Sequence, residues 1–444
     1  MVHSHAAVVS ADGHEALVDR LAGGALAAII LAMHVAPRGG WVFLALLTAL
    51  LFGLLLRSGW RLADATPPTV AGTAFLAFGV LACAGELWSA APGEAIKAGG
   101  VFIAQVGLAI VAADSAARLP QSTVRQLCLG LMIGFVAGLA FVLFEAVTKL
   151  WLHRLIFNNL PALAPVDDQH LHIVRGRIVR IDPSNLKRNM AASALMFWPV
   201  ALLAARRFKD RLGGYLMPAV TLLAGVTAYL STHESSFLAF CAGLAALGAA
   251  SVWFRWTWRS VAALWCLLTL LIVPVMVWQF DAKLYETSWI QFSARHRLVI
   301  WGYSAKQVAL APVLGVGAGS GRVLDDKRTV FDTVPDVDGK QLALSTAAHQ
   351  HDVYLQTWYE MGGLGAAMLA LAGLTGLWRI SRLPAAVRSY ALAAFVSAMV
   401  MVSTSYGLWQ EWFEASIAIG AVMAALSIRY VDPSAFQFKP QRPA

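Results

Sequence analysis

Apolar stretches alternate with short polar breaks along almost the whole chain. Many of these stretches approach the roughly 20 residues that an α-helix needs to cross a bilayer. Because a backbone in lipid must satisfy its hydrogen bonds within the segment, each stretch is predicted to be a helix. The predicted spans lie near residues 20–36, 41–57, 70–88, 98–114, 127–149, 189–205, 214–231, 236–254, 260–280, 353–377, 388–406 and 412–428. The pattern predicts an all-α polytopic membrane protein with about 12 transmembrane helices.

The composition narrows the class of protein further. Of the 444 residues, 59% are hydrophobic and 13% are charged, whereas soluble domains carry about 25% charged residues. This deficit excludes a soluble enzyme, a disordered protein and a nucleic-acid-binding module, despite a formal net charge of +9. We therefore expect membrane lipids as partners and no nucleic acid.

The distribution of basic residues predicts the orientation. Basic residues gather in every second short connection: Arg57, Arg61, Arg118, Arg125, Arg206, Arg207, Lys209, Arg211, Arg255, Arg259, Arg379, Arg382 and Arg388. The positive-inside rule assigns these connections, and with them both termini, to the cytoplasm. The predicted division is a cytoplasmic tail (1–19), helices 1–5 (20–149), an outer basic loop (150–188), helices 6–9 (189–280), a long outer loop (281–352), helices 10–12 (353–428) and a cytoplasmic tail (429–444).

Both outer loops are rich in basic residues, against this trend. Their basic side chains include Arg154, Arg175, Arg177, Arg180, Lys187, Arg188, Arg295, His296, Arg297, Lys306, Arg322, Lys327, Arg328 and Lys340. Long loops are partly exempt from the charge rule, so these residues could be solvated loop charges. The alternative is an anionic ligand on the outer face, because guanidinium groups match the geometry of phosphate.

The long outer loop contains two candidate motifs. Its first part, SARHRLVIWGYSAKQVALAPVLGVGAGSG (293–321), predicts a surface helix followed by a flexible Gly-rich turn. The turn is not a phosphate-binding loop, because no GxxxxGK[ST] pattern follows. Its last part, AAHQHDVYLQTWYEMGGLG (347–365), places His349 and His351 at the mouth of a membrane helix.

These histidines have three interpretations. A neutral imidazole is a suitable general base near pH 7, but the pair could also only form hydrogen bonds at the interface. A metal site would combine them with Asp336 and Asp338, or with His170 and His172; we expect no metal. A further polar segment, THESS (232–236), is interpreted as a short cap at an outer helix end.

The motifs of the long loop resemble the signature of the O-antigen ligase and polymerase superfamily. In that family an Arg-x-x-x-Trp segment leads to a Pro-x-x-Gly-x-Gly turn, then to a His-[Asn/Ser/Gln] pair and, nine residues later, to Gly-x-x-Gly. The matching segments here are RLVIW (297–301), PVLGVG (312–317), His351 with Asp352, and GGLG (362–365). Asp352 departs from the usual second residue. His349 and Gln350 supply a His-Gln pair instead, but the spacing then ends at Glu360, so His349 remains a rival to His351.

The resemblance implies a GT-C-type membrane glycosyltransferase, with its active site on the periplasmic face of the bacterial inner membrane. Family ligases transfer O-antigen polysaccharide from undecaprenyl pyrophosphate to lipid A–core oligosaccharide. They need no metal or other cofactor, and the reaction is thought to invert the anomeric centre.

The same chemistry suggests roles for the candidate residues. A general base must take the proton of the acceptor hydroxyl, and His351 is the expected base. Arginines would stabilise the growing charge of the pyrophosphate leaving group, with Arg188 and Arg297 expected in this catalytic role. Further substrate-binding candidates are Arg180, Lys187, Arg295 and His349.

Other functions remain open at this point. An O-antigen polymerase would join two lipid-linked repeats, and a protein O-oligosaccharyltransferase would use a protein acceptor. A non-enzymatic transporter of lipid-linked glycans would carry charged or broken spans at mid-membrane, whereas the polar groups of this sequence gather near one face.

Overall fold

Helices dominate the computed structural model, which describes residues 2–65, 67–160, 171–206, 214–327, 330–347 and 350–436. The first half of the chain forms α1 (Val2–Val35), α2 (Gly40–Arg57), α3 (Val70–Ala84), α4 (Glu94–Arg118), α5 (Gln121–Val147), α6 (Trp151–Asn159), β1 (Leu171–Val174), β2 (Arg177–Ile181) and α7 (Lys187–Arg206). The second half forms α8 (Leu216–Leu230), α9 (Glu234–Asp281), α10 (Phe292–Val308), α11 (Ser320–Asp326), β3 (Thr333–Pro335), β4 (Gln341–Ala343), α12 (Val353–Arg382), α13 (Ala385–Thr404) and α14 (Glu411–Val431).

The apolar helices confirm a polytopic all-α membrane protein. Within the described residues, 10 helices are long and apolar enough to cross a bilayer. All the spans predicted from the sequence lie on helices, although three of them do not each correspond to one full-length helix. The segment 214–231 coincides with α8, which has only 15 residues, and the segments 236–254 and 260–280 lie on the single helix α9.

Helix α9 folds back on itself. A straight helix of its 48 residues would measure about 72 Å, more than twice the roughly 30 Å hydrocarbon core of a bilayer. The backbone leaves the helical region at Trp253 (φ −126°, ψ 56°). Both ends of α9 lie near α10, because Glu234 acts electrostatically on Arg297 and Asp281 forms an ion pair with Lys306 at 2.7 Å.

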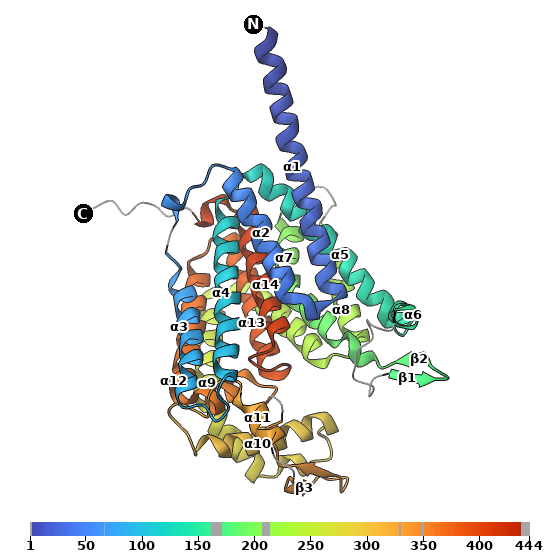
Figure 1. The fold of residues 1–444 in the computed structure, drawn as a ribbon, viewed down its shortest axis with the longest axis vertical. Coiled ribbons are helices and arrows are strands. Elements are labelled where there is room, and N and C mark those ends of the chain that lie inside the picture. The colour runs from blue at the N-terminus through green and yellow to red at the C-terminus, as the bar shows by residue number, and fades with distance from the viewer. Residues whose placement is uncertain are drawn as a thin grey trace, which may run out of the picture.

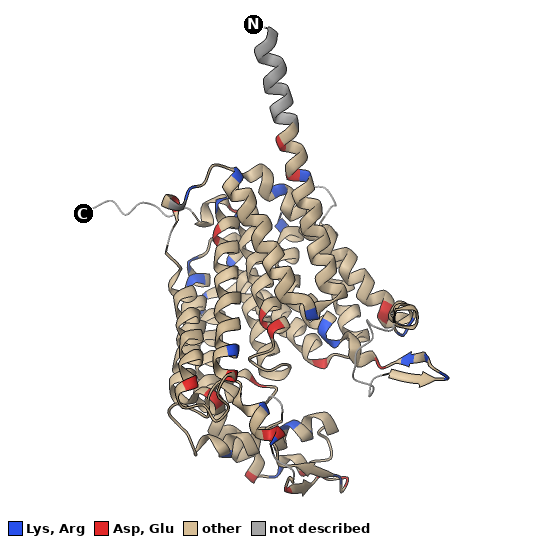
Figure 2. Cartoon of the chain, in the orientation of Figure 1, with Lys and Arg blue, Asp and Glu red and all other residues tan. Residues whose placement is uncertain are grey.

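The bundle has two distinct ends (Figure 1). One end, called the terminal face below, carries the start of α1 and the end of α14. The opposite end, called the loop face below, carries α6, the β1–β2 hairpin, α10, α11 and the β3–β4 hairpin. Charged residues are sparse along the middle of the helices and gather at the two ends and on the loop-face extensions (Figure 2).

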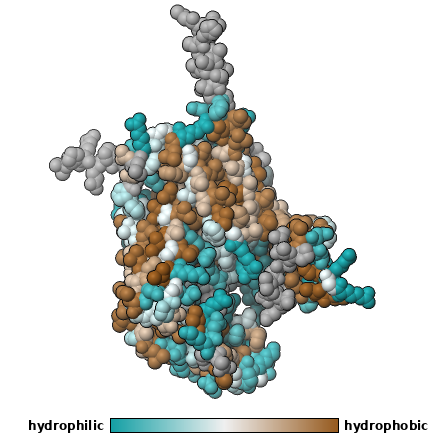
Figure 3. Space-filling model, viewed as in Figure 1, coloured by the Kyte–Doolittle hydropathy of each residue, from teal (hydrophilic) through white to brown (hydrophobic). Residues whose placement is uncertain are grey.

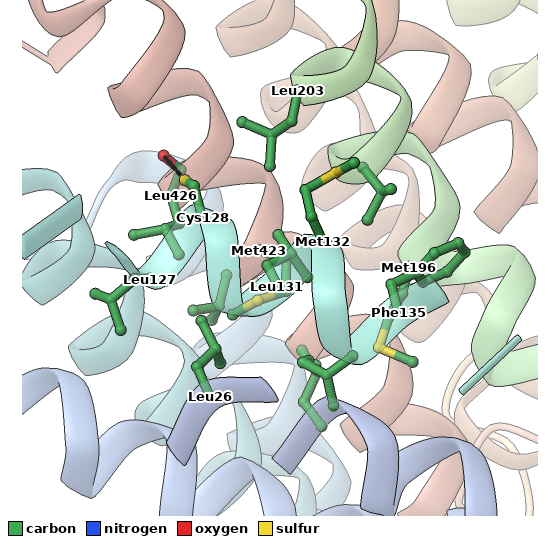
Figure 4. Packing of buried hydrophobic residues seen from close by; sticks show 14 of the residues in the cluster. Leu26, Leu127, Cys128, Leu131, Met132, Phe135, Met196, Leu203, Met423 and Leu426 are labelled. Carbon is green, nitrogen blue, oxygen red and sulfur yellow. Dashed lines mark hydrogen bonds between the residues drawn. The ribbon is translucent and has the colours of Figure 1, made fainter. Parts of the chain in front are cut away.

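Buried apolar side chains from helices distant in sequence hold the bundle together. In Figure 4, Leu26 of α1, Leu127 and Phe135 of α5, Met196 of α7 and Leu426 of α14 pack into one cluster. The outer flanks of the bundle are also largely apolar, while hydrophilic residues gather toward the loop face (Figure 3). An apolar flank is expected where a helix bundle faces lipid.

The Gly-rich turn packs against a break in α12. Four backbone hydrogen bonds join the two segments: Val316 N to Tyr359 O (3.1 Å), Gly317 N to Glu360 O (2.9 Å), Gly363 N to Pro312 O (2.8 Å) and Leu364 N to Val313 O (3.2 Å). The Glu360 carboxylate also accepts the N–H groups of Gly319 and Gly321 at 2.9 and 3.3 Å. The expectation of a flexible turn is therefore wrong, and these glycines have a structural role.

Replacing Gly362 with Ala is expected to destabilise the protein strongly. Gly362 has φ +62° and ψ −163°, a region that essentially only glycine occupies and that costs other residues about 1–3 kcal/mol. A Cβ there would also lie 2.3 Å from the backbone of Val313. Thermal unfolding of the purified protein in detergent should show a lower midpoint for this variant.

The matched control is Gly100→Ala in α4. Nothing lies within 4 Å of a Cβ at Gly100, and alanine is the better helix former. Its unfolding midpoint should stay at or slightly above that of the wild type. Equal midpoints for Gly362→Ala and Gly100→Ala would contradict the tight contact between the turn and α12.

Candidate functional site

The site begins at the carboxyl end of α13, where the last carbonyl groups of a helix have no partner within the helix. Arg297 of α10 donates from Nη1 to the Thr404 carbonyl oxygen at 2.7 Å. His351, just before α12, donates from Nδ1 to the Ser405 carbonyl oxygen at 2.7 Å. The partial negative charge at a helix carboxyl end favours a cationic donor such as Arg297. Three segments distant in sequence thus meet at the loop face.

Helix α10 also fixes the segment that precedes His351. The indole of Trp301 donates to the Gln350 carbonyl oxygen at 2.6 Å, one helical turn after Arg297. The Arg-x-x-x-Trp spacing therefore directs one side chain to the end of α13 and the other to the approach of α12. His351 itself adopts a left-handed backbone conformation, with φ +57°. Such conformations in non-glycine residues occur frequently at functional sites.

Two further segments lie beside Arg297 and His351, and these residues together are called the cluster below. Tyr406 lies in the α13–α14 connection, and burial raises the pKa of its phenol although Arg188 and Arg297 act in the opposite direction. Lys187, at the start of α7, acts electrostatically on both His351 and His233. Three of the basic side chains predicted for the site, Lys187, Arg188 and Arg297, therefore lie around one small region.

The protonation of His351 suits a general base. The Ser405 carbonyl can only accept, so Nδ1 carries the hydrogen and the neutral ring has its lone pair at Nε2. Burial lowers the pKa of His351 below its ordinary value, and Arg297, His296 and Lys187 lower it further. The hydrogen bond to Ser405 acts in the opposite direction. The imidazole is therefore neutral near pH 7.

His233 is a second neutral imidazole beside the cluster. Burial, Lys187 and Arg297 lower its pKa to about 3. Its Nδ1 lies 2.6 Å from the Ser236 hydroxyl, and its ring centroid is 5.8 Å from that of Tyr406. The THESS segment thus contributes His233 beside the site, although the His233 side chain forms no capping hydrogen bond to α9.

Asp352 has a structural role that explains its place in the motif. Its carboxylate accepts the N–H of Leu355 at 2.8 Å and caps the start of α12. Asn, Ser and Asp are all favoured N-cap residues, so aspartate can replace the usual residue at this position. Burial raises the pKa of Asp352 to about 7.

Arg295 turns away from the cluster. It is 4% exposed, and its guanidinium forms ion pairs with Asp336, at 3.3 Å, and with Asp338. These aspartates lie in the turn of the β3–β4 hairpin, so Arg295 anchors this hairpin to α10. Its contacts favour a structural role over the predicted contact with substrate. The described residues contain no group of three or more His, Cys, Asp or Glu suited to a metal ion.

The other predicted residues differ in their positions. Arg180 lies on β2, exposed and in register with His172 of β1. No contact among the described residues joins it to the cluster, so it is the weakest of the predicted substrate-binding residues. His349 and His170 lie outside the described residues.

Two components of the site were not predicted from the sequence. Tyr406 was not a candidate, although TSYGLWQEW (404–412) places a tyrosine between two outer helix ends. The Thr404 and Ser405 carbonyl groups have no sequence signal, because every residue carries one. His233 was visible only as part of a polar cap.

Fold and site together define a polytopic helical membrane protein with a cationic, imidazole-containing site at one end of its bundle. Residues 219–370, from α8 into α12, match the model of the O-antigen ligase family. The match supports, over this part of the chain, the superfamily resemblance inferred from the motifs. The matched region contains Arg297 and His351 but ends before Tyr406 and begins after Arg188.

Relatives from three bacteria support the same family. A "Putative polysaccharide ligase" of Rickettsia prowazekii is 28% identical over 146 residues, which are 32% of this chain and 35% of the relative. Proteins of the same description from Rickettsia typhi and Rickettsia felis are 27% and 26% identical over 146 and 149 residues. These matches cover 32% and 33% of this chain and 35% and 36% of those relatives. The chain thus aligns with only about a third of the length of each relative.

Proposed function

We propose that the protein is an O-antigen ligase-type glycosyltransferase. It transfers O-antigen polysaccharide from undecaprenyl pyrophosphate to lipid A–core oligosaccharide on the periplasmic face of the bacterial inner membrane. Family membership supports a membrane enzyme that acts on polysaccharide. The observation that carries the proposal is the meeting of Arg188, Arg297 and His351 around the end of α13.

In the proposed reaction, a hydroxyl oxygen of the acceptor attacks the anomeric carbon of the donor sugar. The bond from that carbon to the pyrophosphate oxygen breaks, and the leaving group departs with the electron pair. Nε2 of His351 takes the hydroxyl proton. Attack from the side opposite the leaving group inverts the anomeric centre, in a GT-C-type enzyme.

The cationic side chains take the role of stabilising the leaving group. The charge on the pyrophosphate grows as its bond to the sugar breaks, and preorganised donors stabilise such charge most effectively. Arg297 is held by its bond to Thr404, so its guanidinium needs little reorganisation. Lys187 and Arg188 lie at the start of α7. The partial positive charge at the amino end of a helix adds to the charge of these two side chains. We propose that these fixed charges make a metal ion unnecessary.

The charge distribution supports the proposed orientation. The short connections between helices at the terminal face contain most of the arginines found in short connections. By the positive-inside rule, this favours a cytoplasmic position for that face. The loop face is then periplasmic. No nucleotide-sugar pool exists there, so a donor must arrive attached to lipid.

Transfer with purified components tests the proposed function. We expect the full chain to move glycan from undecaprenyl pyrophosphate to lipid A–core, and we expect EDTA to leave the initial rate unchanged. Mass spectrometry of the lipid products identifies the acceptor. Products found only as longer lipid-linked chains would assign the protein to the polymerases, and loss of activity in EDTA would contradict a metal-independent reaction.

A further inference from the structure

The terminal face contains a cavity of about 360 Å³ at the turn within α9. This volume falls within the roughly 300–1,000 Å³ typical of small-molecule sites. Its walls come from the α9 turn around Trp253 and from the start of α13. The Ser389 hydroxyl donates to the Ala250 carbonyl at 3.2 Å and joins the two walls. The cavity lies at the opposite end of the bundle from the candidate functional site.

The lining of this cavity is positively charged and contains no acidic residue. Arg255 and Arg388 both line it, and no acidic side chain among the described residues pairs with either of them. The Arg388 guanidinium lies 4.2 Å from the centroid of the Phe254 ring, which fixes its position over the cavity wall. Two guanidinium groups that have no acidic partner among the described residues and share one hollow favour an anionic ligand with several acceptor oxygens.

Two helix starts add to the positive potential of the cavity. The second half of α9 begins after Trp253, and α13 begins at Ala385 behind a proline that offers no side-chain cap. The first N–H groups of a helix have no partner within the helix and carry partial positive charge. Both starts contribute residues to the same cavity.

Two tryptophans of the lining indicate where the cavity lies along the membrane normal. Trp253 and Trp256 belong to the lining and are 66% and 68% exposed. Tryptophans concentrate where the hydrocarbon core meets the polar head groups. Arg259 stacks on Trp256 and Arg382 on Trp378, at 5.4 and 5.5 Å from the ring centroids, which continues an Arg–Trp pattern around this end of the bundle. The exposed tryptophans of the lining are therefore of the type that favours the boundary between the hydrocarbon core and the head groups.

We propose that this cavity binds the phosphate group of an anionic membrane phospholipid. The phosphodiester lies between Arg255 and Arg388, and the acyl chains follow the apolar flanks of α9 and α13. A soluble phosphate has the same chemistry but lacks these chains. Basic pockets between transmembrane helices are an established means of holding anionic lipid head groups.

Lipid-dependent thermal unfolding of the delipidated full chain in detergent tests this site. The probes are phosphatidylglycerol, phosphatidylcholine with the same acyl chains, and inorganic phosphate. We expect phosphatidylglycerol to raise the unfolding midpoint at the lowest concentration. In Arg255→Glu, the concentration for half of this effect should rise by about tenfold or more, because attraction becomes repulsion.

Arg125→Glu is the matched control, since it reverses the same charge on an exposed residue of α5 at the terminal face, outside the cavity lining. It should respond to phosphatidylglycerol as the wild type does. Equal responses of the two variants, or equal responses to the two lipids, would overturn the site. An effect of inorganic phosphate equal to that of phosphatidylglycerol would overturn the lipid as its source.

A second measurement does not depend on the folding of a variant. A photoreactive phosphatidylglycerol, crosslinked to the wild-type chain, should label peptides that contain residues 250–256 or 385–389. Labelling spread evenly over the terminal-face helices would overturn the proposal.

Discussion

Replacing His351 with Ala is expected to lower the rate of glycan transfer by about 10²–10⁴-fold, the usual contribution of a general base. The variant removes the lone pair at Nε2 that accepts the hydroxyl proton. It also removes the hydrogen bond to the Ser405 carbonyl. The measurement is the initial rate of transfer to lipid A–core with purified protein, combined with size-exclusion chromatography to verify folding.

His172→Ala is the matched control for this variant. His172 is exposed on β1, at the loop face but on the separate β1–β2 hairpin. Its removal should leave the rate near that of the wild type. A folded His351→Ala protein with a rate close to the wild-type rate would remove His351 from the reaction and make His349 the next candidate.

The pH dependence of kcat/KM provides a second readout for the same base. Protonation inactivates a general base, so the rate falls as pH decreases through the pKa of the free enzyme. The pKa of His351 lies below the ordinary value because of burial and nearby positive charges. The acid limb should therefore lie below about pH 6.5. An acid limb above this value would contradict the assignment.

Replacing Arg297 with Gln is expected to lower the transfer rate by about 10²–10³-fold, as for the loss of one preorganised donor to a developing charge. The change also shifts the pH profile. Arg297 lowers the pKa of His351, so its loss should move the acid limb toward higher pH. A purely structural role for Arg297 would lower the rate without this directional shift.

Arg297→Lys separates charge from geometry. Lysine keeps the positive charge but lacks the planar fork that binds a phosphate and a carbonyl together. We expect an intermediate rate and an acid limb near that of the wild type. The control is Arg322→Gln on α11, whose side chain is 73% exposed and, within the described part of the chain, forms an ion pair with Asp326 one turn further along the helix. Its rate should remain unchanged.

The transmembrane helices were predictable because the bilayer imposes a simple requirement on length and polarity. The same rule treats every apolar run separately. It gave the two halves of α9 as two spans, and the backbone break at Trp253 divides α9 between them. The short α8 was found by its apolar character despite having only 15 residues.

The candidate site was partly predictable for a different reason. Arg188, Arg297 and His351 are of types suited to pyrophosphate chemistry, and each stands where a loop meets a helix. Arg295 is of the same type and only two residues from Arg297, yet it turns to Asp336 and Asp338. Sequence spacing could not separate the two arginines, because the difference depends on the β3–β4 hairpin that packs against α10.

The carboxyl end of α13 has a consequence for how the site can evolve. This helix end positions Arg297 and His351 through hydrogen bonds to peptide carbonyl oxygens. Every amino acid contributes such a carbonyl group to the backbone. Side chains of similar size at 404 and 405 can therefore replace one another without moving the imidazole or the guanidinium. Two homologous enzymes could differ at both positions and still inherit the same arrangement.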